Sequence, residues 1–420
     1  MQADFEPTEI GEIPEDWQVV NLRDIVREFK NGFASGRRDD RGIVQIRMNN
    51  VTTDGKVTLN RYLKVPVQGD IQNLLLRSGD LLFNNTNSID LVGKSAIFEG
   101  APFPCTFSNH FTRIRADETK VVPRWILYHL LVLWKRRRFE SLAIRHVGQS
   151  AVHADDLSRM KIPLPSLTEQ REIVTVLSTV DDAIQKTDEI IAKTQQLKKG
   201  LMQRLLTQGL GHNKFKQTRI GEMPEEWSLS SLSQVCRIID CKHRTPKYSD
   251  EGYPVVRPGD LKPRRLSLDA CLRTTSEEYA DLTSNYAPKR GDIVFSRNAS
   301  FGVASYVTTD EEFAIGQDVV IVTSDSNSTL FYFYVLNSTI IDRQLKKLST
   351  GSTFKRINLE EIRELEVPSP PMSEQEQIAA ILSDVDRKIE KENYRKQHLG
   401  ELKEGLMQVL LTGKVRVKVN

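Results

Sequence analysis

Basic and amide side chains gather in loop-like stretches of this sequence, where they offer positive charge and hydrogen-bond donors. The main gatherings are Gly32–Gly42 and Asp240–Tyr248, and shorter polar runs follow the apolar segments Gly79–Phe83 and Gly291–Phe295. Guanidinium and ammonium groups neutralise phosphates, and guanidinium and amide groups can hydrogen-bond to base edges. The candidate DNA-binding residues are therefore Arg37, Arg38, Arg41, Asn84, Asn87, Lys94, Lys242, His243, Arg244, Lys247, Arg257, Arg297 and Asn298. For each of them taken singly, a solvated loop residue is the alternative.

The search for catalytic motifs gives only one partial match, to a phosphate-binding loop. Gly93–Ser95 resembles the end of such a loop, but Ser88 stands where its first glycine belongs, and the second half of the chain has Gly302–Ala304 instead. Metalloprotease, serine-hydrolase and dinucleotide-binding motifs are absent from the sequence. We predict no catalytic residue.

The cysteines permit a zinc site but do not favour one. Cys236, Cys241, His243 and Cys271 offer ligand atoms, and four residues separate the first two cysteines. They occur in one half of the chain only and lack a second tight pair, so buried thiols and a polar loop histidine are the preferred interpretation. We predict neither a metal site nor a disulfide framework, and a reducing compartment fits.

Length and composition place these loops in a large globular protein. The chain has 420 residues, of which 39% are hydrophobic and 27% charged, enough for two or three domains. Its apolar runs are shorter than the ~20 residues of a membrane span, and its acidic start does not resemble a signal peptide, so we expect a cytoplasmic protein. The formal net charge is only +3, so DNA binding must depend on where the charges lie.

The elements that position the loops occur twice. Ile10–Trp17 recurs as Ile220–Trp227, and Leu197–Thr207 recurs nearly unchanged as Leu402–Thr412. The segments Gly79–Phe83 and Gly291–Phe295 correspond between them, so the order of the motifs is preserved. The ends of the two copies match while their middles diverge, which favours one scaffold with two different binding surfaces over ordinary drift.

Each copy consists of a strand-rich part and a long helix. Short β-branched and aromatic runs with Gly, Pro and Asn between them fill residues 10–165 and 220–370, and a helix of about 40 residues follows each, with Thr168 or Ser373 as the expected N-cap. Apolar residues at alternating steps of four and three, such as Ile173, Leu177 and Val180, predict a coiled-coil seam whose middle is polar. Two separate surface helices are the alternative.

We therefore predict an α+β fold in which two similar α/β domains are separated by two long helices that form an antiparallel coiled coil with pseudo-two-fold symmetry. The predicted boundaries are a first domain at 1–165, a central spacer helix at 166–210, a second domain at 211–370, and a C-terminal spacer helix and tail at 371–420.

These motifs together resemble the specificity subunit of type I restriction-modification enzymes. Ile10–Trp17 and Ile220–Trp227 are similar to the start of that family's target recognition domains, Pro163–Ile173 to the start of its spacer helices, and Leu406–Arg416 to its carboxy end. Asp240–Tyr248 and Gly42–Asn50 resemble recurrent segments of its recognition domains. The resemblance covers essentially the whole chain.

The resemblance implies a non-catalytic DNA reader. Its two domains would each read half of a bipartite asymmetric target in double-stranded DNA, with two methyltransferase subunits docked on the scaffold and motor and nuclease subunits joining them. S-adenosylmethionine, ATP and magnesium would belong to those partners, and this chain would hold no cofactor. A specificity subunit of a related modification system and a coiled-coil scaffold that does not bind DNA are the alternatives.

Overall fold

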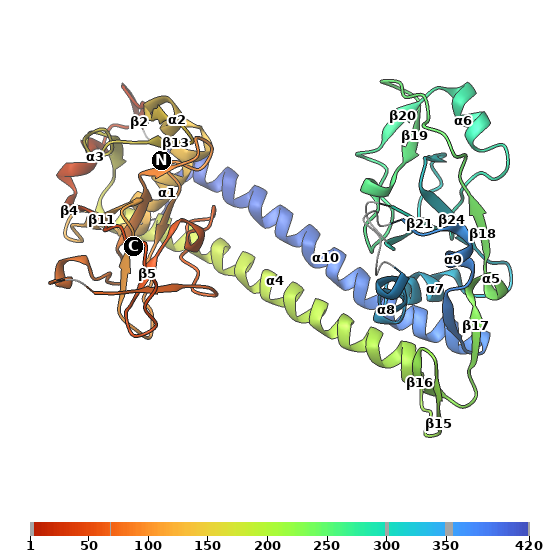
Figure 1. Cartoon of the computed structure of the whole chain (residues 1–420). Coiled ribbons are helices and arrows are strands. Elements are labelled where there is room, and N and C mark those ends of the chain that lie inside the picture. Colours follow the sequence, from red (N-terminus) through yellow and green to blue (C-terminus); the bar gives the residue numbers. More distant parts are fainter. Residues whose placement is uncertain (1–3, 68, 299–301, 349–355, 419–420) are drawn as a thin grey trace. The chain divides into compact units, whose positions relative to one another are not determined.

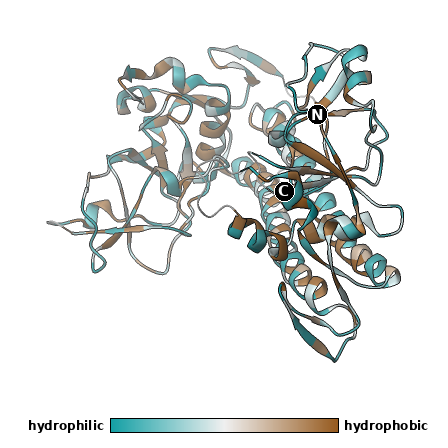
Figure 2. Ribbon diagram, turned by 45° about the vertical axis from the view of Figure 1, so that its right-hand side comes forward, coloured by the Kyte–Doolittle hydropathy of each residue, from teal (hydrophilic) through white to brown (hydrophobic). Residues whose placement is uncertain are grey.

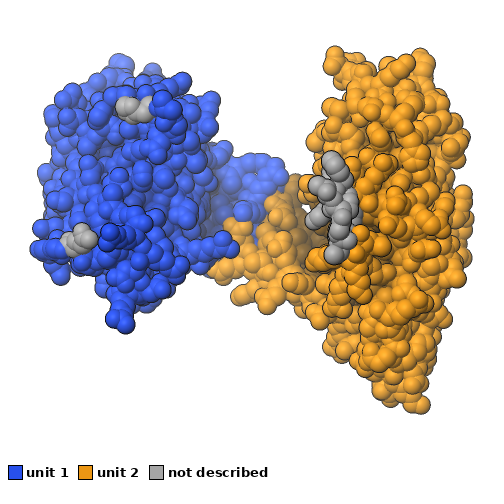
Figure 3. Space-filling model, viewed as in Figure 1, with its two compact units in different colours: residues 1–187, 395–420 blue, residues 188–394 orange. Residues whose placement is uncertain are grey.

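The computed structural model describes residues 4–67, 69–298, 302–348 and 356–418 and divides into two compact units (Figure 1 and Figure 3). Unit 1 comprises Met1–Thr187 with Arg395–Asn420, and unit 2 comprises Asp188–Tyr394. Each unit therefore contains one strand-rich domain and parts of both long helices. Among the described residues, no helix is long and apolar enough to cross a membrane.

Unit 1 is built on a four-stranded antiparallel sheet in the order β4-β11-β7-β9. A three-stranded sheet, β10-β5-β6, has one parallel pair, β5 with β10. Smaller sheets are β12-β13-β8, β1-β2 and β14-β3. The strands are β1 (Phe5–Thr8), β2 (Gly11–Pro14), β3 (Gln18–Asn21), β4 (Val26–Asn31), β5 (Ile43–Ile46), β6 (Leu63–Val65), β7 (Leu81–Asn84), β8 (Thr86–Asn87), β9 (Ser95–Ile97), β10 (Cys105–Phe107), β11 (Phe111–Ala116), β12 (Ile144–His146), β13 (Gln149–Ala151) and β14 (Lys161–Leu164).

The helices of unit 1 cover one face of the four-stranded sheet. They are α1 (Pro123–Lys135), α2 (Arg138–Leu142), α3 (Ala154–Ser158), the beginning of α4 (Leu167–Gln208) and the end of α10 (Met372–Leu410). Helix α1 begins with a proline, whose missing N–H costs nothing at that position, and it buries Trp125 and Tyr128 against the sheet. Figure 2 shows the hydrophobic segments on the central strands and on the helices.

Unit 2 repeats this plan. Its four-stranded sheet, β18-β24-β21-β22, corresponds to β4-β11-β7-β9, and its three-stranded sheet, β20-β19-β23, again has one parallel pair, β19 with β23. The strands are β15 (Phe215–Thr218), β16 (Gly221–Pro224), β17 (Ser228–Ser231), β18 (Arg237–Asp240), β19 (Tyr253–Val256), β20 (Leu272–Thr274), β21 (Ile293–Ser296), β22 (Ala304–Tyr306), β23 (Ala314–Ile315), β24 (Val319–Thr323) and β25 (Glu366–Ser369). Its helices are the second part of α4, α5 (Leu232–Val235), α6 (Ser276–Leu282), α7 (Thr329–Leu336), α8 (Thr339–Leu348), α9 (Leu359–Arg363) and most of α10 (Met372–Leu410). The duplication predicted from the sequence is confirmed.

The two long helices run antiparallel within each unit. In unit 1, Ile173 and Leu177 near the start of α4 share a core with Met407 and Leu410 near the end of α10. In unit 2, Leu205 near the end of α4 shares a core with Ile378 and Leu382 near the start of α10. The predicted seam residues are buried or half-buried along α4, so the coiled-coil spacing is confirmed.

The predicted N-caps of the long helices are wrong by a few residues. Helices α4 and α10 begin at Leu167 and Met372, so Thr168 and Ser373 lie inside the first turn. The hydroxyl of Ser166 accepts the backbone N–H of Glu169 at 3.3 Å and therefore caps α4. A serine or threonine three residues before an acidic residue occurs both at N-caps and in the first turn of helices, so this sequence pattern alone does not locate the cap.

Candidate nucleic-acid interface

A tryptophan at the start of each repeat is hydrogen-bonded to the first turn of the following long helix. The indole N–H of Trp17 donates to Glu169 at 3.1 Å, and that of Trp227 donates to Glu374 at 2.9 Å. Both tryptophans are buried. The repeated Ile-Gly-Glu-x-Pro-x-x-Trp segment thus anchors each domain to its helix.

A second repeated contact joins each domain to both long helices. The hydroxyl of Tyr128 donates to Asp181 at 2.8 Å, and Lys403 pairs with the same carboxylate at 2.6 Å. In unit 2, Tyr334 donates to Asp386 at 2.9 Å and Lys198 pairs with it at 2.6 Å. Burial, and secondarily the neighbouring carboxylate, raise the pKa of both tyrosines, so they stay neutral donors. The framework is therefore the same in both units.

The loops differ, and in unit 1 the basic loop is open to solvent. Arg37, Arg38 and Arg41 are exposed, and Arg38 pairs with the exposed Asp40 at 3.0 Å. Arg47 holds the loop from beneath by donating to the carbonyl oxygen of Ser35 at 2.8 Å. The loop also borders a hollow of about 460 Å³, which is lined by Phe33, Ala34, Ser35, Gly36, Arg37, Pro66, Asp70, Ile71 and Leu74.

Two predicted contacts of unit 1 are buried instead. Asn84 is 0% exposed and donates to the carbonyl oxygen of His110, while its own oxygen accepts from the half-buried Asn87. Lys94 is 7% exposed, its ammonium group donates to the carbonyl oxygen of Met48, and burial lowers its pKa. Asn84 and Lys94 cannot reach DNA from these positions without rearrangement, so they do not support the predicted interface.

In unit 2, two of the predicted cations hold the loop rather than face solvent. Lys242 pairs with Asp281 of α6 at 2.9 Å, and Arg244 pairs with both Glu278 and Asp281. Hydrogen bonds from these cations lower the pKa of the two carboxyl groups, and those carboxyl groups raise the pKa of Arg244. The loop is therefore clamped to α6.

The remaining loop side chains alternate in exposure. His243, Thr245 and Lys247 are exposed, Lys242 and Arg244 are half-buried, and Pro246 is buried. The backbone N–H of Arg244 donates to the carbonyl oxygen of Lys242 at 2.8 Å, so the loop turns at His243. The exposed side chains of His243, Thr245 and Lys247 are those that a ligand can reach.

Arg297 lies beneath the loop and is 5% exposed. Its guanidinium group donates to Asp240 at 2.9 Å and to the carbonyl oxygen of Ile357 at 3.1 Å. Its neighbour Asn298 donates to Asp318 at 3.4 Å, and Arg257 pairs with Asp260 at 3.1 Å. Arg297, predicted to bind DNA, instead makes its contacts in the interior of the domain.

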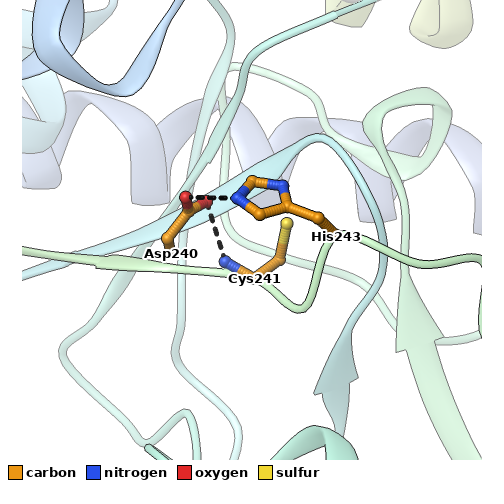
Figure 4. Close-up of side chains that lie close together, drawn as sticks. All are labelled: Asp240, Cys241 and His243. Atoms are coloured by element: carbon orange, nitrogen blue, oxygen red, sulfur yellow. Dashed lines mark hydrogen bonds and ion pairs between the residues drawn. The ribbon is translucent and has the colours of Figure 1, made fainter.

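Asp240, Cys241 and His243 lie close together, with their ligand atoms within 4.8 Å of one another (Figure 4). The carboxylate of Asp240 contacts the Nε2 atom of His243 at 3.0 Å and accepts the backbone N–H of Cys241 at 2.9 Å. Arg297 already neutralises this carboxylate, and burial raises the pKa of the Cys241 thiol, which opposes the thiolate form that binds metals. The cluster therefore fits a hydrogen-bonded loop anchor better than a metal centre. Cys236 and Cys271 are buried free thiols.

Sequence reasoning missed the acidic partners on α6. Thr275 caps this helix by accepting the backbone N–H of Glu278 at 3.4 Å, so the Thr-x-x-Glu signature is present in the sequence. It could have located the helix. It could not have shown that Glu278 and Asp281 face the loop more than 30 residues earlier.

The framework and the loops define a class of protein: a scaffold that presents two recognition domains of one design with two different surfaces. The family model for the type I restriction modification DNA specificity domain matches residues 14–196 and again 224–401. The chain therefore belongs to the type I restriction-modification DNA specificity family.

Relatives that match most or all of this chain agree with this family. A putative type I restriction enzyme MjaX specificity subunit from Methanocaldococcus jannaschii is 31% identical, with 99% of this chain and 98% of that protein covered. The StySPI specificity subunit from Salmonella potsdam is 24% identical over 88% of this chain and 81% of its own length. The solved S subunit from M. genitalium shares the fold, with a TM-score of 0.58 at 14% identity over 98% of this chain and 99% of that one.

Proposed function

We propose that this chain reads a bipartite, asymmetric target in double-stranded DNA, with one half-site read by each unit. The observation that carries the proposal is the contrast between an identical framework and different loops. The tryptophan, tyrosine and aspartate contacts recur in both units. The basic loop is open in unit 1 and clamped to α6 in unit 2.

The exposed side chains supply the chemistry for this reading. In unit 1 they are the guanidinium groups of Arg37, Arg38 and Arg41, and in unit 2 they include His243 and Lys247. Such groups neutralise phosphates and hydrogen-bond to base edges. Affinity for DNA should therefore fall steeply as salt rises.

The chain itself would be non-catalytic, and its partners would carry the chemistry. Two methyltransferase subunits would dock on the scaffold, and motor and nuclease subunits would join through the complex. S-adenosylmethionine, ATP and magnesium would be bound by those subunits. This division of labour rests on membership of the family and on the lack of catalytic motifs in the sequence.

A domain exchange tests the proposal. Residues 220–370 are replaced by the equivalent domain of a relative with a known target, and methylated bases are mapped in cells that carry the hybrid and its methyltransferase. One half of the methylated target should change and the other should stay. A change in both halves would contradict reading by separate units. A wild-type complex whose DNA binding is weak and insensitive to salt would favour a scaffold without DNA contacts.

A further inference from the structure

The sheet topology of unit 2 brings three chain segments together at one end of its strands. Strand β24 is antiparallel to both β18 and β21, so the ends of β18 and β21 lie beside the start of β24. Asp240 is the last residue of β18, Arg297 follows the last residue of β21, and Asp318 precedes β24. The backbone N–H of Arg297 donates to the carbonyl oxygen of Asp318 at 2.9 Å, and its own carbonyl oxygen accepts from Ile357 at 2.9 Å. Arg297 is thus fixed on both sides.

A chain of polar contacts runs from this buried arginine to the surface. The guanidinium group of Arg297 holds one oxygen of Asp240, and the other oxygen contacts the Nε2 atom of His243 at 3.0 Å. Side-chain exposure rises along this series of contacts, from 6% for Arg297 through 22% for Asp240 to 58% for His243. Because a carboxylate oxygen only accepts, Nε2 carries a hydrogen, and Nδ1 is the ring atom left for a partner. In the neutral ring Nδ1 accepts from a base-edge N–H, and in the imidazolium it donates to a phosphate or base oxygen.

We propose that His243 is a DNA-contacting residue of unit 2 and that Asp240 and Arg297 are its positioning residues. This inference rests on the proposed function and assigns roles within its second domain. The contact is a hydrogen bond between the His243 ring and a polar atom of DNA, on a phosphate or a base edge. The clamp of Lys242 and Arg244 on α6 holds the remainder of the loop, so the imidazole is presented from a rigid support.

The test uses the full chain in complex with its methyltransferase subunits and measures affinity for the target duplex and for duplexes with single base changes. His243→Ala should weaken target binding about 10-fold or more, as expected for a charge-assisted hydrogen bond. A base contact would relax one position of one half-site, whereas a phosphate contact would weaken binding to all sequences alike.

Asp240→Asn and Arg297→Lys test the positioning roles. Asp240→Asn keeps an acceptor for the imidazole and removes the charge that Arg297 holds, so target affinity should fall by a smaller factor than in His243→Ala. The double variant of Asp240→Asn and His243→Ala should bind no more weakly than His243→Ala alone, because both act on one contact. Arg297→Lys should lower target affinity by a similar factor to Asp240→Asn.

Arg290→Ala is the matched control. Arg290 is an exposed arginine that precedes β21, at the opposite end of that strand from Arg297, where it pairs with Asp310. Its loss should leave target binding unchanged. An unchanged affinity of His243→Ala in a complex whose wild-type form binds the target would overturn the inference and leave the proposed function standing. Absence of specific binding by the wild-type complex would instead refute the proposed function.

Two further outcomes would also overturn it. Independent effects of Asp240→Asn and His243→Ala on affinity would show that the two residues do not act through one contact. Loss of target binding by the wild-type complex on treatment with EDTA, matched by Cys241→Ser, would make the cluster a metal centre.

Discussion

Asp386→Ala should destabilise unit 2 while leaving unit 1 unchanged. The carboxylate accepts from Tyr334 at 2.9 Å and pairs with Lys198 at 2.6 Å, and the Lys198 ammonium group also lies 5.5 Å from the centre of the Tyr334 ring. The substitution leaves a buried hydroxyl and a mostly buried ammonium group without their acceptor.

The magnitude follows from burial. Breaking a fully buried ion pair costs about 3–5 kcal/mol, and an exposed pair contributes less than about 1 kcal/mol. The side chains of Lys198 and Asp386 are 18% and 20% exposed, so solvent screens the pair in part. Together with the unpaired tyrosine hydroxyl, we expect a loss of about 2–3 kcal/mol in the free energy of opening of unit 2.

Native-state hydrogen exchange on the full chain measures this loss for each unit separately. Amides of α7 and β24 should lose protection in Asp386→Ala, and those of α1 and β11 should not. Asp384→Ala is the control, because Asp384 lies on the same helix, is 63% exposed and pairs with Arg387 three residues later. Equal effects of the two substitutions would refute the reasoning. Asp181→Ala should show the reverse pattern, with the loss confined to unit 1.

Three other predictions concern the loops and the helices. The carboxylates of Glu278 and Asp281 have lowered pKa values, so their contribution to loop anchoring is present above the ordinary values of 4.5 and 3.8 and is lost as the pH falls through the lowered values. The protection of the loop amides in residues 241–247, measured against exchange of the unfolded chain at the same pH, should therefore fall as the pH is lowered below 3.8. Lys247→Ala should weaken DNA binding and reduce its salt slope by about one if Lys247 contacts a phosphate. Four residues inserted near Thr194 lengthen α4 by about 6 Å. At roughly 3.4 Å per base pair, the spacing between the half-sites should grow by at most about two base pairs. A methylation map should show this longer spacing and unchanged half-site sequences.

The fold was predictable because the repeated residues carry the framework. Trp17 and Trp227 anchor their domains to the acidic first turns of the long helices. The polar middle of the coiled-coil seam was also predictable from the sequence, and the structure shows why polar side chains can be buried there. Thr187 is 1% exposed, and its hydroxyl donates to the carbonyl oxygen of Ala183 one turn earlier. A polar seam residue thus satisfies its hydrogen bond within its own helix.

The candidate site was only partly predictable, because residue type does not reveal which partner a charge will meet. Arg297 and Lys247 are both cations in polar stretches of the sequence, yet one is buried against Asp240 and the other is exposed. The difference arises from contacts distant in the sequence. Strands β18 and β21 place Asp240 beside Arg297, although 57 residues separate them.

Arg416 and His212 show the same limit in the framework itself. The guanidinium group of Arg416 contacts Glu169 at 2.6 Å, and the imidazole of His212 contacts Glu374 at 2.9 Å. Each carboxylate that accepts from a tryptophan is therefore also bound by a cationic or donor side chain. That side chain lies just after the end of the other long helix. The repeats do not align these two residues: the register that matches Leu197–Thr207 to Leu402–Thr412 places Arg416 opposite Gly211.

Different residues at different positions therefore perform one task, because what the buried carboxylate requires is a donor at the right distance rather than a particular side chain. Sequence repeats report contacts made by equivalent residues. They do not reveal a contact that both units make through different residues at different positions.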